Sequence, residues 1–349
     1  MERVQRQIMR SLLAGPKTFW QLIREQDGHL SLFVSAIASL KEEGLIAEKS
    51  RFLELTEEGR KVARSFGLIP LLETNCYSCS GRGIVIGGVF RRVLEEFQEI
   101  AVSRPEAIPE FDQGFVEPEI SVARVAFMYA RGDLEGKRLL FIGDDDLTSI
   151  AAALTGMAEE IAVLEIDQRI LEFVEKVASE RNIKNLQTFR FDVRNPLPPE
   201  FAKRYDTFFT DPVETVPGIK LFLSRCAQGL KGPETSGYLG LTHLEASRQK
   251  WHTIQKMLLE MGFAITDIIR DFHSYELERE GFIERNYPLV LRSSSSFHLE
   301  VPELNWYTSS LIRVEAVQEP QPLVSEPMEM DRELYFDEEA YATLPVITD

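Results

Sequence analysis

Apolar positions follow two different patterns along the chain. Helical spacing dominates the N-terminal part, and strand-length apolar segments alternate with helical ones in the later part. Residues 1–66 carry apolar side chains at helical spacing, for example Ile8, Leu12 and Leu13, which predicts three helices and then a small hairpin at 44–56. From Lys137 onwards, continuously apolar segments of strand length alternate with amphipathic helical segments. Such strands are buried on both faces, so this pattern predicts a mostly parallel sheet covered by helices on both sides.

The two periods predict four parts. We expect a winged-helix domain at 1–70, a connector with a loop and helices at 71–135, a Rossmann-like doubly wound α/β domain at 136–315, and an acidic flexible tail at 316–349. Residues 1–66 contain 11 Lys/Arg and 9 Asp/Glu. Because this is no strong basic surface, packing or dimerisation is favoured over DNA binding for the first domain.

Composition narrows the class of protein. The formal net charge of −17 argues against nucleic acid as the partner of the whole chain. No apolar run reaches the roughly 18 residues of a membrane span. Three cysteines are too few for a disulfide framework, so a cytoplasmic location is expected. The acidic tail is expected either to solvate the protein or to gather a cationic substrate, with Tyr335, Phe336 and Tyr341 available for cation–π contacts.

Acidic residues follow each of the first four predicted strands of the α/β part. The first strand ends in a turn at Gly143, and the acids are Asp144, Asp145, Asp146, then Glu165 and Asp167, then Asp192, then Asp211 and Glu214. An acid after the second strand commonly accepts hydrogen bonds from ribose hydroxyls, and one after the third can accept from an adenine amino group. Asp146 alone is explained as a cap of the following helix. Capping does not explain three adjacent aspartates that converge with Asp211 on one sheet edge, and such a cluster favours a cationic ligand.

The fourth strand ends in Asp211, Pro212, Val213 and Glu214, which resembles the [DN]-P-P-[YF] motif of amino-group methyltransferases. Glu214 replaces the aromatic ring that would stack a flat base, so a cation gains a partner there. Three aspartates after Gly143 would repel the methionine carboxylate of S-adenosylmethionine. They suit its decarboxylated form, which ends in a bare ammonium group.

With these motifs (GDDDLTS, AVLEID, FTDPVET and ITDIIR behind a C-x-x-C), the chain resembles the branched-chain polyamine synthases, N4-bis(aminopropyl)spermidine synthases of thermophilic archaea and bacteria. The resemblance implies a homodimeric aminopropyltransferase that uses decarboxylated S-adenosylmethionine and spermidine without a metal. It places the catalytic aspartate in the GDDD motif, which by position is Asp145. The chain departs from linear spermidine synthases, whose catalytic aspartate follows the fourth strand, so Asp211 is the competing base.

The remaining acids are distributed around that base. Asp144, Asp146, Asp211 and Glu214 are predicted to bind the polyamine. Gly143, Glu165, Asp167, Asp192 and Pro212 are predicted to bind the donor. Two other functions stay open: a methyltransferase acting on a small amine or a protein, and a winged-helix regulator that senses polyamines.

Cys76 and Cys79 form a C-x-x-C followed by Ser80, Gly81 and Gly83. The small residues predict a turn rather than the helix start of a redox motif. No second pair of metal-binding spacing follows. A structural loop is therefore favoured, with a metal site of two plus two cysteines across a dimer as the weaker alternative.

Overall fold

The N-terminal part folds into three helices and a hairpin, in the predicted order. The computed structural model describes residues 1–108, 111–276, 302–329 and 332–340. The first elements are α1 (Arg3–Leu13), α2 (Phe19–Arg24), α3 (Leu30–Glu42), β1 (Ile46–Lys49), β2 (Phe52–Leu55) and α4 (Glu57–Ser65). Strands β1 and β2 pair antiparallel. These elements have the kind and order of a winged helix, and that assignment stays a prediction.

Two helices lead from this unit to the sheet: α5 (Val89–Ala101) and α6 (Pro118–Ala130). Helix α6 begins with Pro118 in its first turn. All residues from Ile120 to Met128 are buried, including Arg124. Helix α6 is therefore a core element that carries a buried cation, and its neighbours must supply the opposite charge.

Seven strands form the main sheet, in the order β5-β4-β3-β6-β7-β9-β8. Their bounds are β3 (Arg138–Ile142), β4 (Glu160–Glu165), β5 (Leu186–Arg190), β6 (Thr207–Thr210), β7 (Ser236–Leu241), β8 (Phe263–Ser274) and β9 (Thr308–Ala316). The first five strands of that order pair parallel, whereas β9 is antiparallel to both its neighbours. The mostly parallel α/β fold is thus confirmed. Strand β9 was not expected from the sequence.

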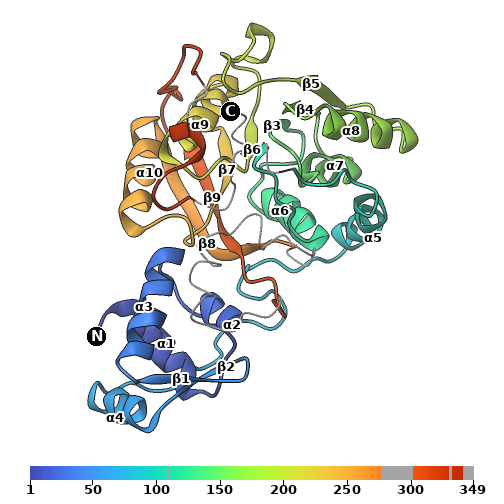
Figure 1. Ribbon diagram of the computed structural model, residues 1–349. Coiled ribbons are helices and arrows are strands. Elements are labelled where there is room, and N and C mark those ends of the chain that lie inside the picture. Colours follow the sequence, from blue (N-terminus) through green and yellow to red (C-terminus); the bar gives the residue numbers. More distant parts are fainter. Residues whose placement is uncertain (109–110, 277–301, 330–331, 341–349) are drawn as a thin grey trace.

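Helices cover both faces of this sheet, as Figure 1 shows. They are α7 (Thr148–Leu154), α8 (Gln168–Glu180), α9 (Val216–Gly229) and α10 (Arg248–Glu260), with the short turn η2 (Pro199–Phe201) between β5 and β6. Alternate residues of β3 serve the two faces: Phe141 packs in the core with α6 and α7, and Leu140 in the core with α9 and α10. In the described ranges, no helix is long and apolar enough to cross a membrane.

The acidic C-terminal segment packs on the α9 side of the sheet. Arg225 of α9 donates from Nη1 to the carbonyl of Val324 (2.8 Å), and Lys250 of α10 pairs with Asp337 (Nζ–Oδ2, 2.6 Å). The short helix α13 (Arg332–Tyr335) follows. This packing differs from the expected flexible tail, because cations of α9 and α10 hold the segment. Tyr341 lies outside the described residues.

Candidate active site

The strand order reverses between β3 and β6, and ligands of doubly wound sheets bind at such a point, beyond the carboxyl ends of the strands. Gly143 follows β3, and Asp211 follows β6. Gly143 has φ +74° and donates its N–H to the carbonyl of Leu164 (3.0 Å). The predicted turn is therefore present, and it places the aspartates after β3 beside those after β6.

Asp144 closes the start of α7. It is buried, and one carboxylate oxygen accepts the N–H of Ser149 (3.0 Å) while the other accepts the Ser149 hydroxyl. Burial raises the pKa of Asp144 to about 8. The expectation that Asp146 caps this helix was wrong, because Leu147, at φ +55°, occupies the N-cap position and Asp144 reaches the first-turn amide instead.

Asp146 forms a buried ion-pair network with Arg124. Its Oδ1 accepts the N–H of Val116 (2.7 Å), and its Oδ2 accepts Nη1 of Arg124 (2.6 Å). Nη2 of the same guanidinium donates to Oδ2 of Asp211 (3.1 Å). Burial lowers the pKa of Arg124, but the two carboxylates outweigh it and raise the pKa overall. Arg124 therefore stays charged and holds the two acids together.

Asp211 is partly exposed, with 21% of its side-chain surface accessible. Tyr275 at the end of β8 also donates to its Oδ2 (3.0 Å). Burial raises the pKa of Asp211 to about 6, although Arg124 opposes the shift. An acid that already accepts two hydrogen bonds on one oxygen keeps its other oxygen, Oδ1, for a ligand.

Asp145 stands apart from its two neighbours. It is partly exposed, and its Oδ2 accepts the backbone N–H of Gly114 (3.0 Å). Burial raises its pKa well above the usual value, and the charges of Asp146 and Glu165 add to the effect. The loop that contains Gly114 thus reaches the carboxyl edge of the sheet through this amide. Of the three adjacent aspartates, Asp145 alone is partly exposed.

Glu214, after β6, has one oxygen committed and one open. Its Oε1 accepts the N–H of Thr242 (2.9 Å), whereas its Oε2 is buried and has no partner among the described residues. Burial raises the pKa of Glu214 well above the usual value, and the charge of Glu245 adds to it. A buried oxygen without a partner is costly, and an ammonium group would satisfy it.

The acids at β4 and β5 are held by local partners. Glu165 accepts the N–H of Asp144 (2.9 Å) and of Asp167 (2.9 Å), so it ties the ends of β3 and β4 together. Asp167 caps α8 and pairs with Arg169 (2.6 Å), and Asp192 pairs with Arg194. Pro212 is buried next to Asp211. The roles of these residues in binding a donor stay predictions.

Comparison with known proteins identifies the family of this chain. A family model described as the branched-chain polyamine synthase A C-terminal domain matches residues 92–342.

The chain belongs to the branched-chain polyamine synthase family.

Several members of the family are similar over most of their length. An N(4)-bis(aminopropyl)spermidine synthase of Thermococcus kodakarensis is 40% identical, over 93% of this chain and 90% of its own. A protein of the same name from Methanocaldococcus jannaschii is 38% identical, over 95% and 93%. The crystal structure of the Thermus thermophilus branched-chain polyamine synthase, in complex with N4-aminopropylspermidine and 5'-methylthioadenosine, matches with a TM-score of 0.85 at 37% identity. It covers 97% of this chain and 93% of its own.

Several residues that contact or surround the candidate acids were not singled out from the sequence: Arg124, Tyr275, Glu245, Asp112 and Gln113. Gln113 donates to Asp167 (2.9 Å), and Asp112 has a raised pKa because of burial and the charges of Glu245 and Asp211. Arg124 left a signal, since it is the one charged residue of the stretch 120–128, in which Ser121 is the only other polar residue. Tyr275 directly follows β8 and the other three lie in loops, where periodicity gives no information.

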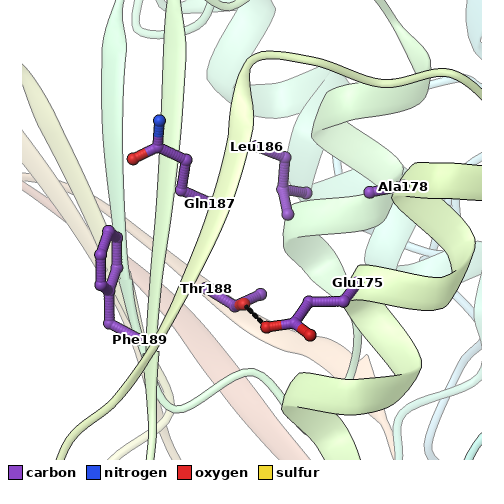
Figure 2. A pocket seen from close by; sticks show the side chains of 6 residues that line it. All are labelled: Glu175, Ala178, Leu186, Gln187, Thr188 and Phe189. Atoms are coloured by element: carbon purple, nitrogen blue, oxygen red, sulfur yellow. Dashed lines mark hydrogen bonds between the residues drawn. The ribbon is translucent and has the colours of Figure 1, made fainter.

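A pocket of about 390 Å³ lies elsewhere, between α8 and β5 (Figure 2). Its lining is Glu175, Ala178, Leu186, Gln187, Thr188 and Phe189. The Glu175 carboxylate accepts a hydrogen bond from the Thr188 hydroxyl. None of the predicted site residues lines this pocket, so it is separate from the carboxylates at the switch point.

Proposed function

We propose that this polyamine synthase transfers aminopropyl groups from decarboxylated S-adenosylmethionine to the N4 secondary amine of spermidine. The products are N4-aminopropylspermidine, N4-bis(aminopropyl)spermidine and methylthioadenosine. One observation supports the proposal above all. The site contains the carboxylate of Asp145 and a buried Oε2 of Glu214 that has no partner among the described residues. These acids would repel a carboxylated donor and attract a polycation. The ligands named for the Thermus structure are one of these polyamines and the expected leaving group, which supports it.

In the proposed reaction, the N4 lone pair attacks the aminopropyl carbon that is bonded to the sulfonium sulfur of the donor. The carbon–sulfur bond breaks, and methylthioadenosine leaves as a neutral thioether. The nitrogen must first lose a proton, which the carboxylate of Asp145 accepts directly or through water. A polycation in the site lowers the raised pKa of Asp145 and so keeps it ionised before the transfer. After the second transfer the nitrogen carries four carbon substituents and is quaternary.

The other acids divide between the two substrates. Asp211 and Glu214 would hold the ammonium ends of the polyamine through their uncommitted oxygens. Asp144 and Asp146 were predicted to do the same, but their oxygens serve Ser149, Val116 and Arg124, so we assign them a supporting role.

For the donor, Glu165 or Asp167 would hold the ribose and Asp192 the adenine, with Gly143 and Pro212 beside the cofactor. We further propose a homodimer in the cytoplasm, which the three free thiols suit.

One assay separates the three candidate functions. The protein is incubated with spermidine and either S-adenosylmethionine or its decarboxylated form, and polyamines and methylthioadenosine are then resolved. Branched products and methylthioadenosine from the decarboxylated donor alone are expected. A methylated product from the carboxylated donor would indicate a methyltransferase. Absence of turnover with salt-dependent DNA binding would indicate a regulator.

The variant Asp145→Asn tests the base. We expect turnover to fall by about 10²–10⁴-fold, because the proton acceptor is lost while size and shape are kept. Circular dichroism and methylthioadenosine binding should be unchanged. Asp206→Asn is the matched control, since Asp206 lies at the opposite end of the sheet, where it accepts the N–H of Arg138 (2.8 Å). Full activity of Asp145→Asn would move the base to Asp211.

A further inference from the structure

The C-x-x-C segment forms a tight turn that takes no part in the proposed reaction. The N–H of Ser80 donates to the carbonyl of Cys76 (2.7 Å), and the N–H of Arg82 to that of Cys79 (2.9 Å). Ser80 and Gly81 have φ of +51° and +86°, a conformation that favours small residues. Cys76 is exposed and Cys79 partly buried, and both thiols are free. The turn thus presents two thiols at the surface.

The two thiols point to a common place. The sulfur of Cys76 accepts hydrogen bonds from the backbone amides of Ser78 and Cys79, and the Cys79 side chain is hydrogen-bonded to it as well. The thiolate is the form that binds metals. Two thiolates two residues apart, stabilised by amides of their own turn, supply two of the four ligands of a structural zinc site.

The missing ligands are not found nearby. Within the described ranges, no group of three or more His, Cys, Asp and Glu residues could hold a metal. The same stretch also exposes large apolar side chains, with Tyr77 92% accessible and Leu72 and Val85 about two thirds accessible. Exposed large apolar side chains in one stretch of chain are typical of a protein contact. One partner would supply both the ligands and the cover, namely the same turn of a second copy across a two-fold axis.

We propose that Cys76 and Cys79 form half of a structural zinc site, which the same two cysteines of a second copy complete as a tetrahedral tetrathiolate. This site would join two chains and is independent of aminopropyl transfer. An ion pair between Arg82 and Glu119 (Nη2–Oε1, 3.3 Å) connects the turn to the first turn of α6. The zinc site would therefore brace the helix that carries Arg124.

The test uses the full chain, purified under reducing conditions with zinc. Metal content and mass are measured by elemental mass spectrometry and analytical ultracentrifugation, and we expect one zinc per two chains. Co²⁺-loaded protein should show the intense visible absorption of tetrahedral tetrathiolate cobalt. The double variant Cys76→Ser, Cys79→Ser should lose both signals and shift towards monomer. Cys226→Ala, which alters the buried cysteine of α9, should keep both.

Removing zinc from the native chain with a chelator gives a second measurement that needs no variant, and dimers should dissociate as zinc is released. One zinc per chain would overturn the proposal, because the ligands would then lie within one copy. Dimers that persist without metal would also overturn it, as would a Cys76–Cys79 disulfide as the stable state under reducing conditions.

Discussion

Arg124 determines which carboxylates of the site can act. Its guanidinium lies between Asp146 and Asp211, at 2.6 Å and 3.1 Å, and is fully buried. Two acids are thereby compensated, whereas Asp145 is bonded by a neutral amide. We propose that this carboxylate, which has no cation partner among the described residues, takes the proton of a substrate amine. One arginine thus gives adjacent aspartates different chemistry.

Replacement of this arginine should destabilise the protein strongly. In Arg124→Met the buried Asp146 and the partly exposed Asp211 lose their partner, and the free energy of unfolding should fall by about 3–5 kcal/mol. Urea denaturation measures this loss. Arg131→Met, at the C-cap of the same helix, is the control, because the Arg131–Asp267 pair is more exposed and its loss should cost about 0.2–1 kcal/mol. Equal losses in the two variants would contradict the role given to Arg124.

The pH dependence of substrate binding should reflect the raised pKa values of the site. At low pH Asp145, Asp211 and Glu214 are protonated and neutral, and they ionise as the pH rises, Asp211 through about 6. Spermidine stays cationic over this range, since alkyl ammonium groups have pKa values of about 10. The KM for spermidine should therefore fall severalfold as the pH rises through 6 at constant ionic strength.

The free energy of unfolding should fall as the pH rises through the same range. The raised pKa of Asp211 stabilises the fold fully below its unfolded value of 3.8, and this contribution is lost as the pH rises through about 6. The variant Asp211→Asn should flatten both profiles. A KM that is constant or rises from about one pH unit below that pKa of about 6 to about two units above it would show that these carboxyls do not bind the acceptor.

The sequence predicted where the acids gather but not what each one does. Periodicity placed Asp145 and Asp211 at strand ends, and parallel strands bring those ends together. The groups that hydrogen-bond to these two acids come from distant segments. Gly114, before α6, donates to Asp145, and Tyr275, directly after β8, donates to Asp211. Even the local cap was misassigned, because the left-handed Leu147 shifts the helix start. Such contacts depend on tertiary structure, which spacing along a single sequence does not encode.

At the level of elements, the strand order explains why β9 was not predicted from the sequence. The helices and first six strands of the α/β part alternate along the chain, so each could be located by its own pattern. Strand β9 comes last and inserts between β7 and β8, antiparallel to both. Its position depends on pairing with residues 34 to 79 positions away, from Ser274 with Thr308 to Ser236 with Glu315. Propensity indicates that such a strand exists and does not indicate where it pairs.

Strand β7 leaves room for the site by means of a glycine. A Cβ at Gly240 would lie 2.2 Å from Oδ1 of Asp211, the oxygen without a bond to Arg124. Gly240→Ala should push this carboxylate away, raise the KM for spermidine severalfold and cost about 1–3 kcal/mol of stability. Steady-state kinetics and thermal melting measure both effects. Gly87→Ala meets no atom within 4 Å and is the control; a normal KM in Gly240→Ala would exclude contact between Asp211 and the acceptor.

Across the whole molecule, the N-terminal unit contacts the loop that follows β7. The N–H of Leu30, first residue of α3, donates to the carbonyl of Leu244 (2.7 Å), and Arg270 of β8 donates to the carbonyl of Gln26 (2.6 Å). The start of α3 thus faces the α/β part (Figure 1). Lys41 is the one cation in this helix. A helix that reads DNA needs basic residues on a free face, so this unit is better suited to support the neighbouring Glu245.

The variant Asp27→Ala tests whether the N-terminal unit supports the acceptor site. The buried carboxylate of Asp27 pairs with Arg3 of its own unit and with Arg248 of α10 (2.7 Å). In Asp27→Ala the contact loosens, so the amide of Leu30 should exchange hydrogen faster, and the KM for spermidine should rise while kcat changes less. Glu58→Ala removes an exposed side chain of α4 and should change neither the exchange rate of Leu30 nor the KM. If exchange at Leu30 accelerates and KM stays constant, the two units touch without the N-terminal one shaping the acceptor site.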